Sequence, residues 1–382
     1  MTFCRSNLPH LSTACCRPNM TFSSEDEQYM RQAIRLSRQG IGYTEPNPLV
    51  GAVVVHEGRV VTTGYHSRYG AYHAEREALS FGDIPEGATL YVTLEPCTHY
   101  GKTPPCLDII LEKKIQRVVV AAVDPGTLVC GKGLEALRSA GVRVDLGCLA
   151  DEAEWVNRHY LTYIRKKRPH IVIKSGLSAD GKMSDASGNS SWVTSEELRC
   201  VANDLRGEFS AVLVGSATIL ADDPSLTIRN SKWPGKKLLR IVLDGSGRLV
   251  SHRFLRSGTE QYPVLWVVSS AADLADPEGV ENLTMLRLDS ESDGRIGLET
   301  LMAALHEMGI ASVLVEGGAV VSDGFLSTGL VDEVILFTAS ALLGGQEALT
   351  PFASGRPIDS PLRLLDHFVI ELESGWIVRG RV

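Results

Sequence analysis

The stretch TLYVTLEPCTHYGKTPPC occupies residues 89–106 and joins an apolar run to a polar loop that contains two cysteines. The run TLYVTL is rich in β-branched and aromatic residues, which predicts a buried strand over 89–94. The apolar spacing after the loop predicts a helix over 107–111. A strand that passes through a loop into a helix is the repeating unit of α/β folds. This stretch therefore predicts an α/β fold with Cys97 and Cys106 at the strand-to-helix turn.

The sequence around this stretch repeats the alternation of strands and helices. Apolar residues at helical spacing predict a helix over 25–37, and the apolar runs 50–55 and 60–65 flank His-Glu-Gly, which predicts a β-hairpin. A mostly parallel central sheet beside this antiparallel hairpin is expected. The remaining predicted elements are a helix that begins near His73, a strand over 117–123, a helix over 133–140 and a strand over 142–144.

The 382 residues exceed the length at which a single hydrophobic core keeps growing, so two domains are expected. A charged helix is predicted over 152–168; it runs into Pro169, and a predicted strand over 170–174 follows at once. We therefore expect one domain over 21–165 and a second over 166–382. The other elements predicted in the second domain are a helix over 298–308 and strands over 211–215, 239–243, 264–268, 312–315 and 333–337.

Residues 1–20 contain Arg, Ser, Cys and Pro but no acidic residue, which faintly resembles a transit peptide. The segment lacks amphipathic periodicity, and chain ends are commonly loose. We expect a disordered extension upstream of Met20, with Met20 as an alternative start.

Charge and cysteine content narrow the class of partner and the compartment. The net charge of −8 argues against a nucleic-acid partner, because affinity for nucleic acid depends on Lys and Arg. The one basic run, residues 165–168, is interpreted as a solvated linker between domains rather than a nucleic-acid-binding patch. Eight cysteines are too few for a disulfide framework, and no apolar run is long enough to span a bilayer. We expect a cytoplasmic protein without a membrane partner.

His73, Cys97 and Cys106 form the strongest functional pattern in the sequence. One imidazole and two thiolates make a three-ligand zinc set that leaves a fourth position open for water, which is typical of a catalytic site. Glu75 follows His73 by two residues and is predicted to move a proton from that water to a leaving amine. Taken singly, each residue also has a structural explanation, since an isolated His or Cys is commonly a core or surface side chain.

Several segments carry a resemblance to one family: PNPLVGAVVV over 46–55, HAE over 73–75 and EPCTHYGKTPPC over 95–106. They are similar to the deaminase half of the bifunctional riboflavin-pathway deaminase-reductases. Eight residues separate the two cysteines here, whereas the wider cytidine and adenosine deaminase family usually has two. Residues 174–199 and 205–229 resemble the reductase half of the same proteins. The resemblance implies a cytidine-deaminase-like three-layer αβα domain followed by a dihydrofolate-reductase-like α/β domain.

The resemblance also implies roles for single residues of the first half. Asn47 would contact the pyrimidine; the alternative is a turn residue held between two prolines. At Gly126-Thr127 the chain departs from the Asn-Pro that the family more often carries, so we carry over no contact from that loop.

The second half would bind NADPH and the ribosyl phosphate. Residues 313–318, VLVEGG, end a predicted strand in two glycines before a helix, so backbone N–H groups there can receive a phosphate; a plain turn is the alternative. The residues that would contact the cofactor are Gly176, Trp192, Thr218 and Asp222, with Gly318, Ala319, Val320, Val321, Ser322, Asp323 and Gly324 beneath its phosphates. Those that would face the ribosyl phosphate are Ser190, Arg206, Leu226, Arg229 and Glu316.

Charged residues in this half have their own physical interpretation. Arg206 and Arg229 offer bidentate charged donors that suit a phosphate, with ordinary surface ion pairs as the alternative. Lys174 and Asp180 lie in or just after an apolar strand, a position that usually marks a function or a buried pair. We expect Lys174 to polarise the open-chain sugar carbonyl as hydride arrives.

Together these features predict a bifunctional, homo-oligomeric enzyme of riboflavin biosynthesis with a small-molecule substrate. It would deaminate 2,5-diamino-6-(5-phosphoribosylamino)pyrimidin-4-one with zinc, and then use NADPH to give 5-amino-6-(5-phosphoribitylamino)uracil. One alternative is a deaminase whose second half is a catalytically silent binding or oligomerisation module. Another is a nucleic-acid deaminase, which the acidic charge, the cysteine spacing and the reductase-like half oppose.

Overall fold

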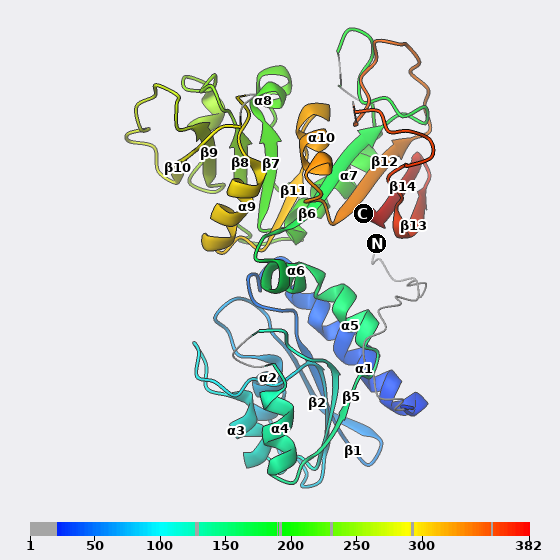
Figure 1. Ribbon diagram of the computed structural model, residues 1–382. Helices are drawn as coiled ribbons and strands as arrows, with labels where there is room; N and C mark the ends of the chain where they lie inside the picture. The colour runs from blue at the N-terminus through cyan, green and yellow to red at the C-terminus, as the bar shows by residue number, and fades with distance from the viewer. Residues whose placement is uncertain are drawn as a thin grey trace. The chain divides into compact units, whose positions relative to one another are not determined.

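The computed structural model describes residues 21–126, 130–188, 190, 193–229, 232–291, 294–352 and 354–382. Residues 1–20, Thr127 and Trp192, which the sequence singled out, lie outside this part of the chain. The chain divides into two compact units between Lys166 and Lys167, and each unit has its own sheet (Figure 1).

The first unit contains the predicted hairpin and the predicted alternation of strands with helices. Its strands are β1 (Gly51–His56), β2 (Arg59–Tyr65), β3 (Thr89–Leu94), β4 (Arg117–Ala122) and β5 (Arg143–Leu146). Its helices are α1 (Ser24–Ser37), α2 (Ala74–Ser80), α3 (Cys106–Glu112), α4 (Lys132–Ser139), α5 (Ala150–Val156) and α6 (Arg158–Lys166).

The first sheet has the strand order β2-β1-β3-β4-β5 and is the middle of three layers. β1 is antiparallel to both of its neighbours, whereas β3, β4 and β5 are parallel. Side chains alternate between two faces: Val54 packs in one core with residues of α2, α3 and α4, and Val53 packs in the other with residues of α1 and α5. The parallel strands β3 and β4 thus have helices on both faces, as parallel strands require.

The structure corrects one predicted element of this unit. The charge pattern predicts a single helix over 152–168, but the structure has two helices, α5 and α6, which Asn157 separates. The Asn157 side chain accepts a hydrogen bond from Leu49 N at 2.7 Å and donates one to Leu49 O at 2.9 Å. An Asn side chain that binds backbone groups in this way competes with helix propagation, which explains the break.

The second unit is built on a nine-stranded sheet. Its helices are α7 (Glu196–Leu205), α8 (Ser216–Asp222), α9 (Leu298–Glu307) and α10 (Ala319–Ser327). Its strands are β6 (His170–Leu177), β7 (Ala211–Gly215), β8 (Leu239–Leu243), β9 (Val264–Ser269), β10 (Leu283–Leu288), β11 (Ser312–Val315), β12 (Glu333–Ala339), β13 (Leu365–Leu372) and β14 (Gly375–Arg381).

The strand order of this sheet is β10-β9-β8-β7-β11-β6-β12-β14-β13. All neighbours from β10 to β12 are parallel, and β14 is antiparallel to both β12 and β13. Helices α9 and α10 pack on one face, and α7 and α8 on the other. The parallel strands β6, β7 and β11 therefore present their carboxyl ends at one edge of the sheet, where ligands of open α/β sheets bind.

The central strands of this sheet agree with the strands predicted from the sequence, whereas β10, β13 and β14, toward its edges, were not predicted. Central strands are buried on both faces and read as continuous apolar runs, whereas β13 alternates between exposed and half-buried residues. A register shift between Leu365 and Phe368 further disturbs the period of two in β13. Among the described residues of the whole chain, no helix is long and apolar enough to cross a membrane.

Candidate functional site

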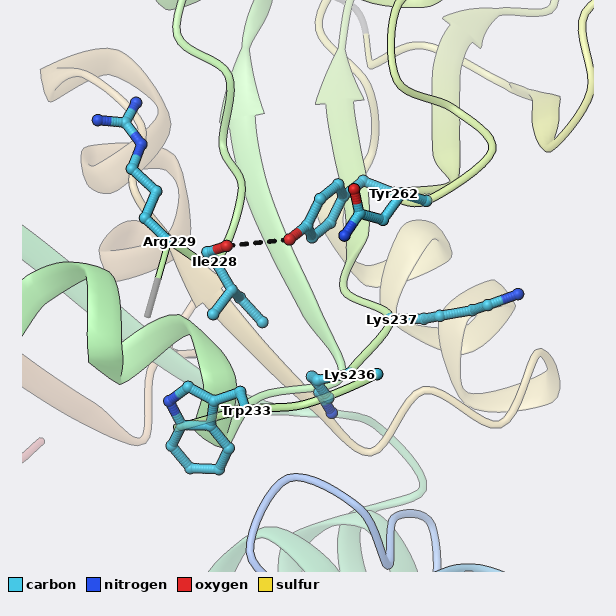
Figure 2. A pocket seen from close by; sticks show the side chains of 8 residues that line it. Ile228, Arg229, Trp233, Lys236, Lys237 and Tyr262 are labelled. Carbon is cyan, nitrogen blue, oxygen red and sulfur yellow. Dashed lines mark hydrogen bonds between the residues drawn. The ribbon is translucent and has the colours of Figure 1, made fainter. Parts of the chain in front are cut away.

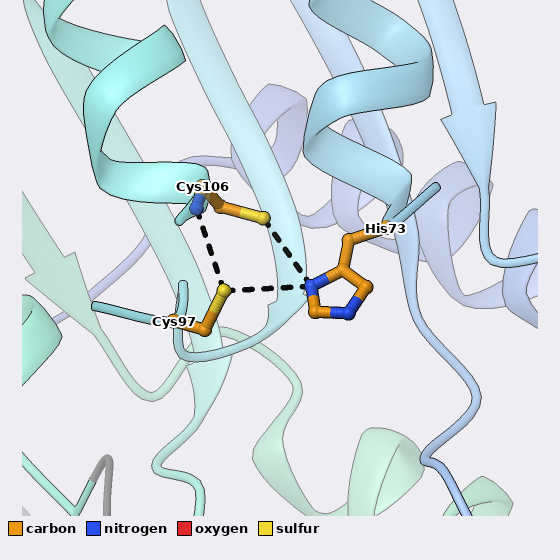
Figure 3. A group of neighbouring side chains, drawn as sticks. All are labelled: His73, Cys97 and Cys106. Carbon is orange, nitrogen blue, oxygen red and sulfur yellow. Dashed lines mark hydrogen bonds between the residues drawn. The ribbon is translucent and has the colours of Figure 1, made fainter. Parts of the chain in front are cut away.

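Three side chains converge just beyond the end of β3 (Figure 3). The Nδ1 atom of His73 lies 3.4 Å from Cys97 Sγ and 3.4 Å from Cys106 Sγ, and the three ligand atoms lie within 4.8 Å of one another. A tetrahedral zinc ion with bonds of about 2.0 Å to nitrogen and about 2.3 Å to sulfur holds such ligands roughly 3.6 Å apart. The donor types and their separations therefore fit a zinc ion.

The fold brings these ligands from three separate segments to one edge of the sheet. His73 is the N-cap of α2, Cys106 is the first residue of α3, and Cys97 lies in the loop that follows β3. Gly64 in β2 allows α2 to approach, because a Cβ there would lie 2.5 Å from Ala74 O. The loop is closed by Leu107 N, which donates to Cys97 O at 3.2 Å.

The two thiols form a buried, coupled pair. The hydrogen bond from the Cys106 thiol, together with the His73 side chain, lowers the pKa of the Cys97 thiol. The Cys106 backbone N–H, at the start of α3, also points at Cys97 Sγ over 3.4 Å. The pKa of the Cys106 thiol is raised, because its proton is held by Cys97 and because it is buried. These contacts favour the thiolate form of Cys97, and the thiolate is the form of cysteine that binds metal.

Glu75 lies in the first turn of α2 and is 3% exposed. Burial raises the pKa of its carboxyl group to about 7, against a smaller opposing effect of His73. A carboxyl group that titrates near neutral pH can both accept and donate a proton during turnover. The position and burial of Glu75 thus suit the proton-transfer role that the sequence predicts for it.

Asn47 lies in the loop before β1, and its amide is oriented by a buried histidine that sequence analysis missed. His66 Nδ1 lies 2.9 Å from the Tyr72 carbonyl oxygen, so Nδ1 carries the proton and Nε2 is the acceptor. Asn47 Nδ2 then donates to His66 Nε2 at 3.3 Å. Burial lowers the pKa of His66, which favours this neutral form. A lone histidine in no motif gives no sequence signal for such a role.

In the second unit, Lys174 and Glu316 come together beside Arg206. Lys174 Nζ lies 2.9 Å from Glu316 Oε2, and Arg206 donates from Nε and Nη2 to the two Glu316 oxygens at 2.7 and 3.0 Å. Burial alone would raise the pKa of Glu316, but the charges of Arg206 and Lys174 outweigh it and lower this pKa to about 2. Glu316, the first residue after β11, is therefore a buried carboxylate that fixes the ammonium of Lys174, a residue in the middle of β6.

Arg206 is more fully engaged by protein groups than its predicted role at the ribosyl phosphate requires. Its Nη1 donates to Asn203 Oδ1 at 3.1 Å and to Thr227 O at 3.0 Å, besides the two bonds to Glu316. These bonds use four of the five N–H donors of a guanidinium. In this arrangement one N–H is left for a ligand, and the phosphate role of Arg206 stays a prediction.

The predicted diphosphate-binding residues lie at the start of α10. Gly318 is its N-cap, and a Cβ there would lie 3.9 Å from Thr218 Oγ1, so the structure brings Thr218 to the same place. Val321 packs against Gly215 and Gly317, whose added Cβ atoms would lie 2.9 and 2.7 Å from it. These small residues let the first turn of α10 approach the ends of β7 and β11, as a phosphate site at a helix N-terminus requires.

Other predicted cofactor and substrate residues of this half are placed as follows. Ser190 donates to Asp222 Oδ1 at 3.1 Å, which brings a predicted substrate residue and a predicted cofactor residue together. A Cβ on Gly176 would lie 3.1 Å from Thr194 Cγ2. Leu226 is buried in the core with a φ of 50°.

The remaining members of the predicted α10 set differ in exposure. Ser322 is buried, whereas Val320 is exposed, and Asp323 accepts a hydrogen bond from Ser354 N at 2.7 Å. An added Cβ on Gly324 would lie 3.4 Å from the Leu298 side chain. Asp180 binds Leu343 N and Gly344 N and so joins two loops.

An open cavity of about 490 Å³ lies between the segment before β8 and Tyr262, whose hydroxyl donates to Ile228 O at 3.0 Å (Figure 2). Arg229, a predicted phosphate ligand, lines it, and its Nη2 donates to Ser225 Oγ at 3.0 Å. Figure 2 shows Arg229, Trp233 and Lys237 pointing in different directions. The charged ends therefore do not converge on one ligand, and we assign no anion site here.

Comparisons with known proteins find one family model in each unit. The family model described as the cytidine and deoxycytidylate deaminase zinc-binding region matches residues 23–122, and the model described as the RibD C-terminal domain matches residues 169–377. The riboflavin biosynthesis protein RibD of Actinobacillus pleuropneumoniae is 39% identical, over 91% of this chain and 93% of its own. The RibD protein of Aquifex aeolicus is 42% identical, over 84% of this chain and 88% of its own.

Two solved structures match this chain over most of its length. The Thermotoga maritima diaminohydroxyphosphoribosylaminopyrimidine deaminase/5-amino-6-(5-phosphoribosylamino)uracil reductase matches with a TM-score of 0.80 and 34% identity, over 94% of this chain and 98% of its own. Acinetobacter baumannii RibD matches with a TM-score of 0.81 and 33% identity, over 94% and 99%.

These matches confirm the predicted fold class and the predicted cofactors, zinc and NADPH. They also favour the bifunctional interpretation over that of a deaminase with a silent second half. Identity extends over both units, and both family models occur in the order that the sequence motifs predict. The chain therefore belongs to the RibD family of bifunctional riboflavin biosynthesis enzymes, which join a deaminase to a reductase.

Proposed function

We propose that residues 21–165 deaminate 2,5-diamino-6-(5-phosphoribosylamino)pyrimidin-4-one, and that residues 166–382 reduce the ribosyl chain of the product to give 5-amino-6-(5-phosphoribitylamino)uracil. The observation that carries the proposal is the convergence of His73, Cys97 and Cys106 next to buried Glu75. The name of the Thermotoga maritima relative gives the same two steps in that protein.

In the deaminase unit, His73, Cys97 and Cys106 would hold the zinc ion. When bound, zinc supplies Lewis acidity that makes a water molecule nucleophilic near neutral pH. Deamination adds water and releases ammonia, so a proton must pass from the water to the leaving amine. Glu75 performs this transfer, because its carboxyl group lies in the first turn of α2 beside the ligands and burial raises its pKa above the usual value.

In this unit, Asn47 is the residue that we expect to orient the substrate. Its amide is turned by the bond from Nδ2 to His66, which fixes one end of the amide before substrate arrives. A polar group that is already oriented binds its ligand without a further loss of side-chain entropy. We assign Asn47 to the pyrimidine ring on this basis.

In the reductase unit, NADPH supplies the hydride when it is bound. Lys174 is the candidate electrophile, because Glu316 holds its ammonium at the carboxyl edge of the sheet over 2.9 Å. A fixed cation at that edge stabilises the negative charge that develops on the open-chain sugar as it accepts hydride. The first turn of α10 would receive the cofactor diphosphate.

We also propose a homo-oligomer in the cytoplasm with no nucleic-acid partner. Support for the oligomer comes from β13, an edge strand on which Leu365 and Val369 are more than half exposed. Apolar side chains on an unpaired sheet edge favour association. Sedimentation analysis of the purified protein tests the oligomer, and a monomer at micromolar concentration contradicts it.

The test of the function is mass analysis of products formed from the diaminopyrimidinone ribosylamino phosphate with zinc-replete enzyme and NADPH. We expect a deaminated and reduced product. A deaminated product alone would limit the function to the first unit, and the same sample titrated with NADPH would then show whether the second unit binds the cofactor. An unchanged substrate would refute the proposal.

A further inference from the structure

Glu95 is a buried carboxylate at the deaminase site that the chemistry above does not use. It is the first residue after β3, is 4% exposed, and precedes the metal-ligating Cys97 by two positions. Its backbone N–H continues the sheet by donating to Ala122 O at 3.0 Å. This bond fixes Glu95 at the carboxyl edge of the sheet, two residues before Cys97.

Both carboxylate oxygens of Glu95 accept hydrogen bonds from backbone N–H groups of the segment that runs from Asp124, just after β4, to Leu134 in the first turn of α4. Oε2 accepts from Asp124 N at 3.3 Å and from Gly131 N at 2.9 Å. Oε1 accepts from Gly133 N at 2.8 Å and from Leu134 N at 3.3 Å. One side chain therefore holds both ends of this segment, although its partners lie 29 to 39 residues away in sequence.

These contacts make Glu95 the cap of α4 from outside the helix. Gly131 stands at the N-cap with a φ of 81° and makes no side-chain cap bond, whereas Gly133 and Leu134 are the second and third residues of the helix. Those are the N–H groups that an N-cap side chain normally satisfies. A negative charge at this end is also favoured by the helix dipole.

A steric contact joins the same helix to the metal-binding loop. A Cβ on Gly133 would lie 2.2 Å from Pro96 O, so only glycine lets the first turn of α4 rest on Pro96. On the other side of the segment, Asp124 Oδ1 accepts from Tyr160 OH and from Gly126 N, both at 2.8 Å. Asp124 and the first turn of α4 are thus held against Glu95 and Pro96, the two residues that follow β3 and precede the loop residue Cys97.

We propose that Glu95 is a positioning residue of deamination. Its carboxylate holds Asp124 and the first turn of α4 against the loop that carries Cys97, so that this side of the substrate site is already in place before the substrate binds. The inference rests on the proposed deaminase function of this unit. Glu95 acts through the segment it holds. Its loss should therefore weaken substrate binding more than it slows the chemical step.

The test is Glu95→Gln in the full-length chain, because this change keeps the shape and alters only the hydrogen bonding. All four partners of Glu95 are donors, so whichever way the amide turns, its NH2 group faces two N–H groups. Loss of hydrogen bonds to a charged group predicts an increase in the KM of deamination of roughly 10- to 100-fold, with kcat changed by less than about threefold. Amide exchange at Gly131, Gly133 and Leu134 should accelerate by a similar factor.

Three controls separate this role from a general structural one. Zinc content and the reductase activity of the same chain should equal those of the wild type. Glu86→Gln removes an exposed carboxylate that pairs with Lys114, and it should leave KM unchanged. Unchanged KM and unchanged amide exchange in Glu95→Gln would overturn the inference, as would a loss of kcat at constant KM.

A second variant keeps the inference testable if Glu95→Gln does not accumulate as folded protein. Gly133→Ala keeps the Glu95 carboxylate in the chain, but its added Cβ would lie 2.2 Å from Pro96 O and 3.1 Å from Glu95 Oε1, so it pushes the first turn of α4 away from both; it should also raise KM at normal zinc content. A normal KM in that variant would contradict the idea that the position of the first turn of α4 matters for substrate binding. If the wild type itself does not deaminate, the proposed function fails, whereas the comparison of amide exchange still tests the anchor.

Discussion

Glu316→Gln is the most informative perturbation of the second unit, because it removes one negative charge that two buried cations share. The side chain of Glu316 is 6% exposed, and those of Lys174 and Arg206 are 16% and 12% exposed. The pKa of Glu316 is lowered from 4.5 to about 2, against the opposing effect of burial, by Arg206 and Lys174. At 1.36 kcal/mol per pKa unit, the ionised form contributes on the order of 3 kcal/mol to stability at pH 7.

The sign of the pH dependence follows from this depressed pKa. The contribution is fully present above the unfolded value of 4.5 and is lost as pH falls toward 2. We therefore expect the free energy of unfolding of the wild type to exceed that of Glu316→Gln by about 3 kcal/mol at pH 7 and by only about 1 kcal/mol at pH 3. At pH 7 the buried cations that lose their partner add to this difference, up to a total of about 5 kcal/mol.

The assay is urea unfolding at pH 7, 5 and 3. Unfolding is monitored by hydrogen exchange in peptides from β6 and β11, so that the stability of the reductase unit is measured separately from that of the first unit. Glu371→Gln is the matched control, since Glu371 is exposed on β13 and its loss should change stability by less than about 0.5 kcal/mol. A Glu316→Gln difference below 1 kcal/mol at pH 7, or one that is constant between pH 7 and pH 3, would refute the electrostatic account of this cluster.

Three further predictions concern the two sites and the core behind the first. Cys97→Ala should abolish zinc binding and deamination but spare reduction of supplied deaminated substrate; metal analysis and two activity assays check this, and equal loss of both activities would contradict independent sites. Lys174→Met should slow single-turnover hydride transfer by roughly 100- to 1000-fold at normal NADPH affinity, and an unchanged rate would remove Lys174 from the chemistry. Asp26→Asn should destabilise the first unit by about 3–5 kcal/mol, because Asp26 accepts two bonds from Arg117 and one from Tyr91; near-normal urea unfolding would show that the network contributes little.

The elements that sequence analysis predicted are those whose signal is local. The convergence of His73, Cys97 and Cys106 could be predicted because each lies within a few residues of a strand end or a helix start, and because one imidazole with two thiolates has few other uses. The central strands could be predicted because burial on both faces makes a continuous apolar run. The metal site and the core of both sheets therefore followed from short windows of sequence.

What could not be predicted depends on contacts between distant segments. His66 orients Asn47 across 19 residues, and Glu95 caps a helix that begins 37 residues later, so no local pattern marks either one. For Arg206 the residue type alone predicts a phosphate ligand, because a guanidinium offers bidentate charged donors. Only the fold shows that Glu316, Asn203 and Thr227 already occupy most of its donors.

Glu95 and Glu316 occupy the same structural position in the two units and yet should respond differently to the same substitution. Each is the first residue after a parallel strand, and each backbone N–H continues the ladder, to Ala122 O in one case and to Leu213 O in the other. Their partners differ: backbone N–H groups hold Glu95, whereas side-chain cations hold Glu316. Backbone donors belong to a particular segment, so losing the charge of Glu95 should mainly free that segment.

The cations around Glu316 carry full charges in a buried place, so losing that carboxylate should chiefly destabilise the fold and release Lys174. Glutamine at 95 should therefore change KM, and glutamine at 316 should change stability and hydride transfer. If the two substitutions instead had the same effect, position after the strand would matter more than the identity of the partners, and the roles argued for both residues would have to be revised.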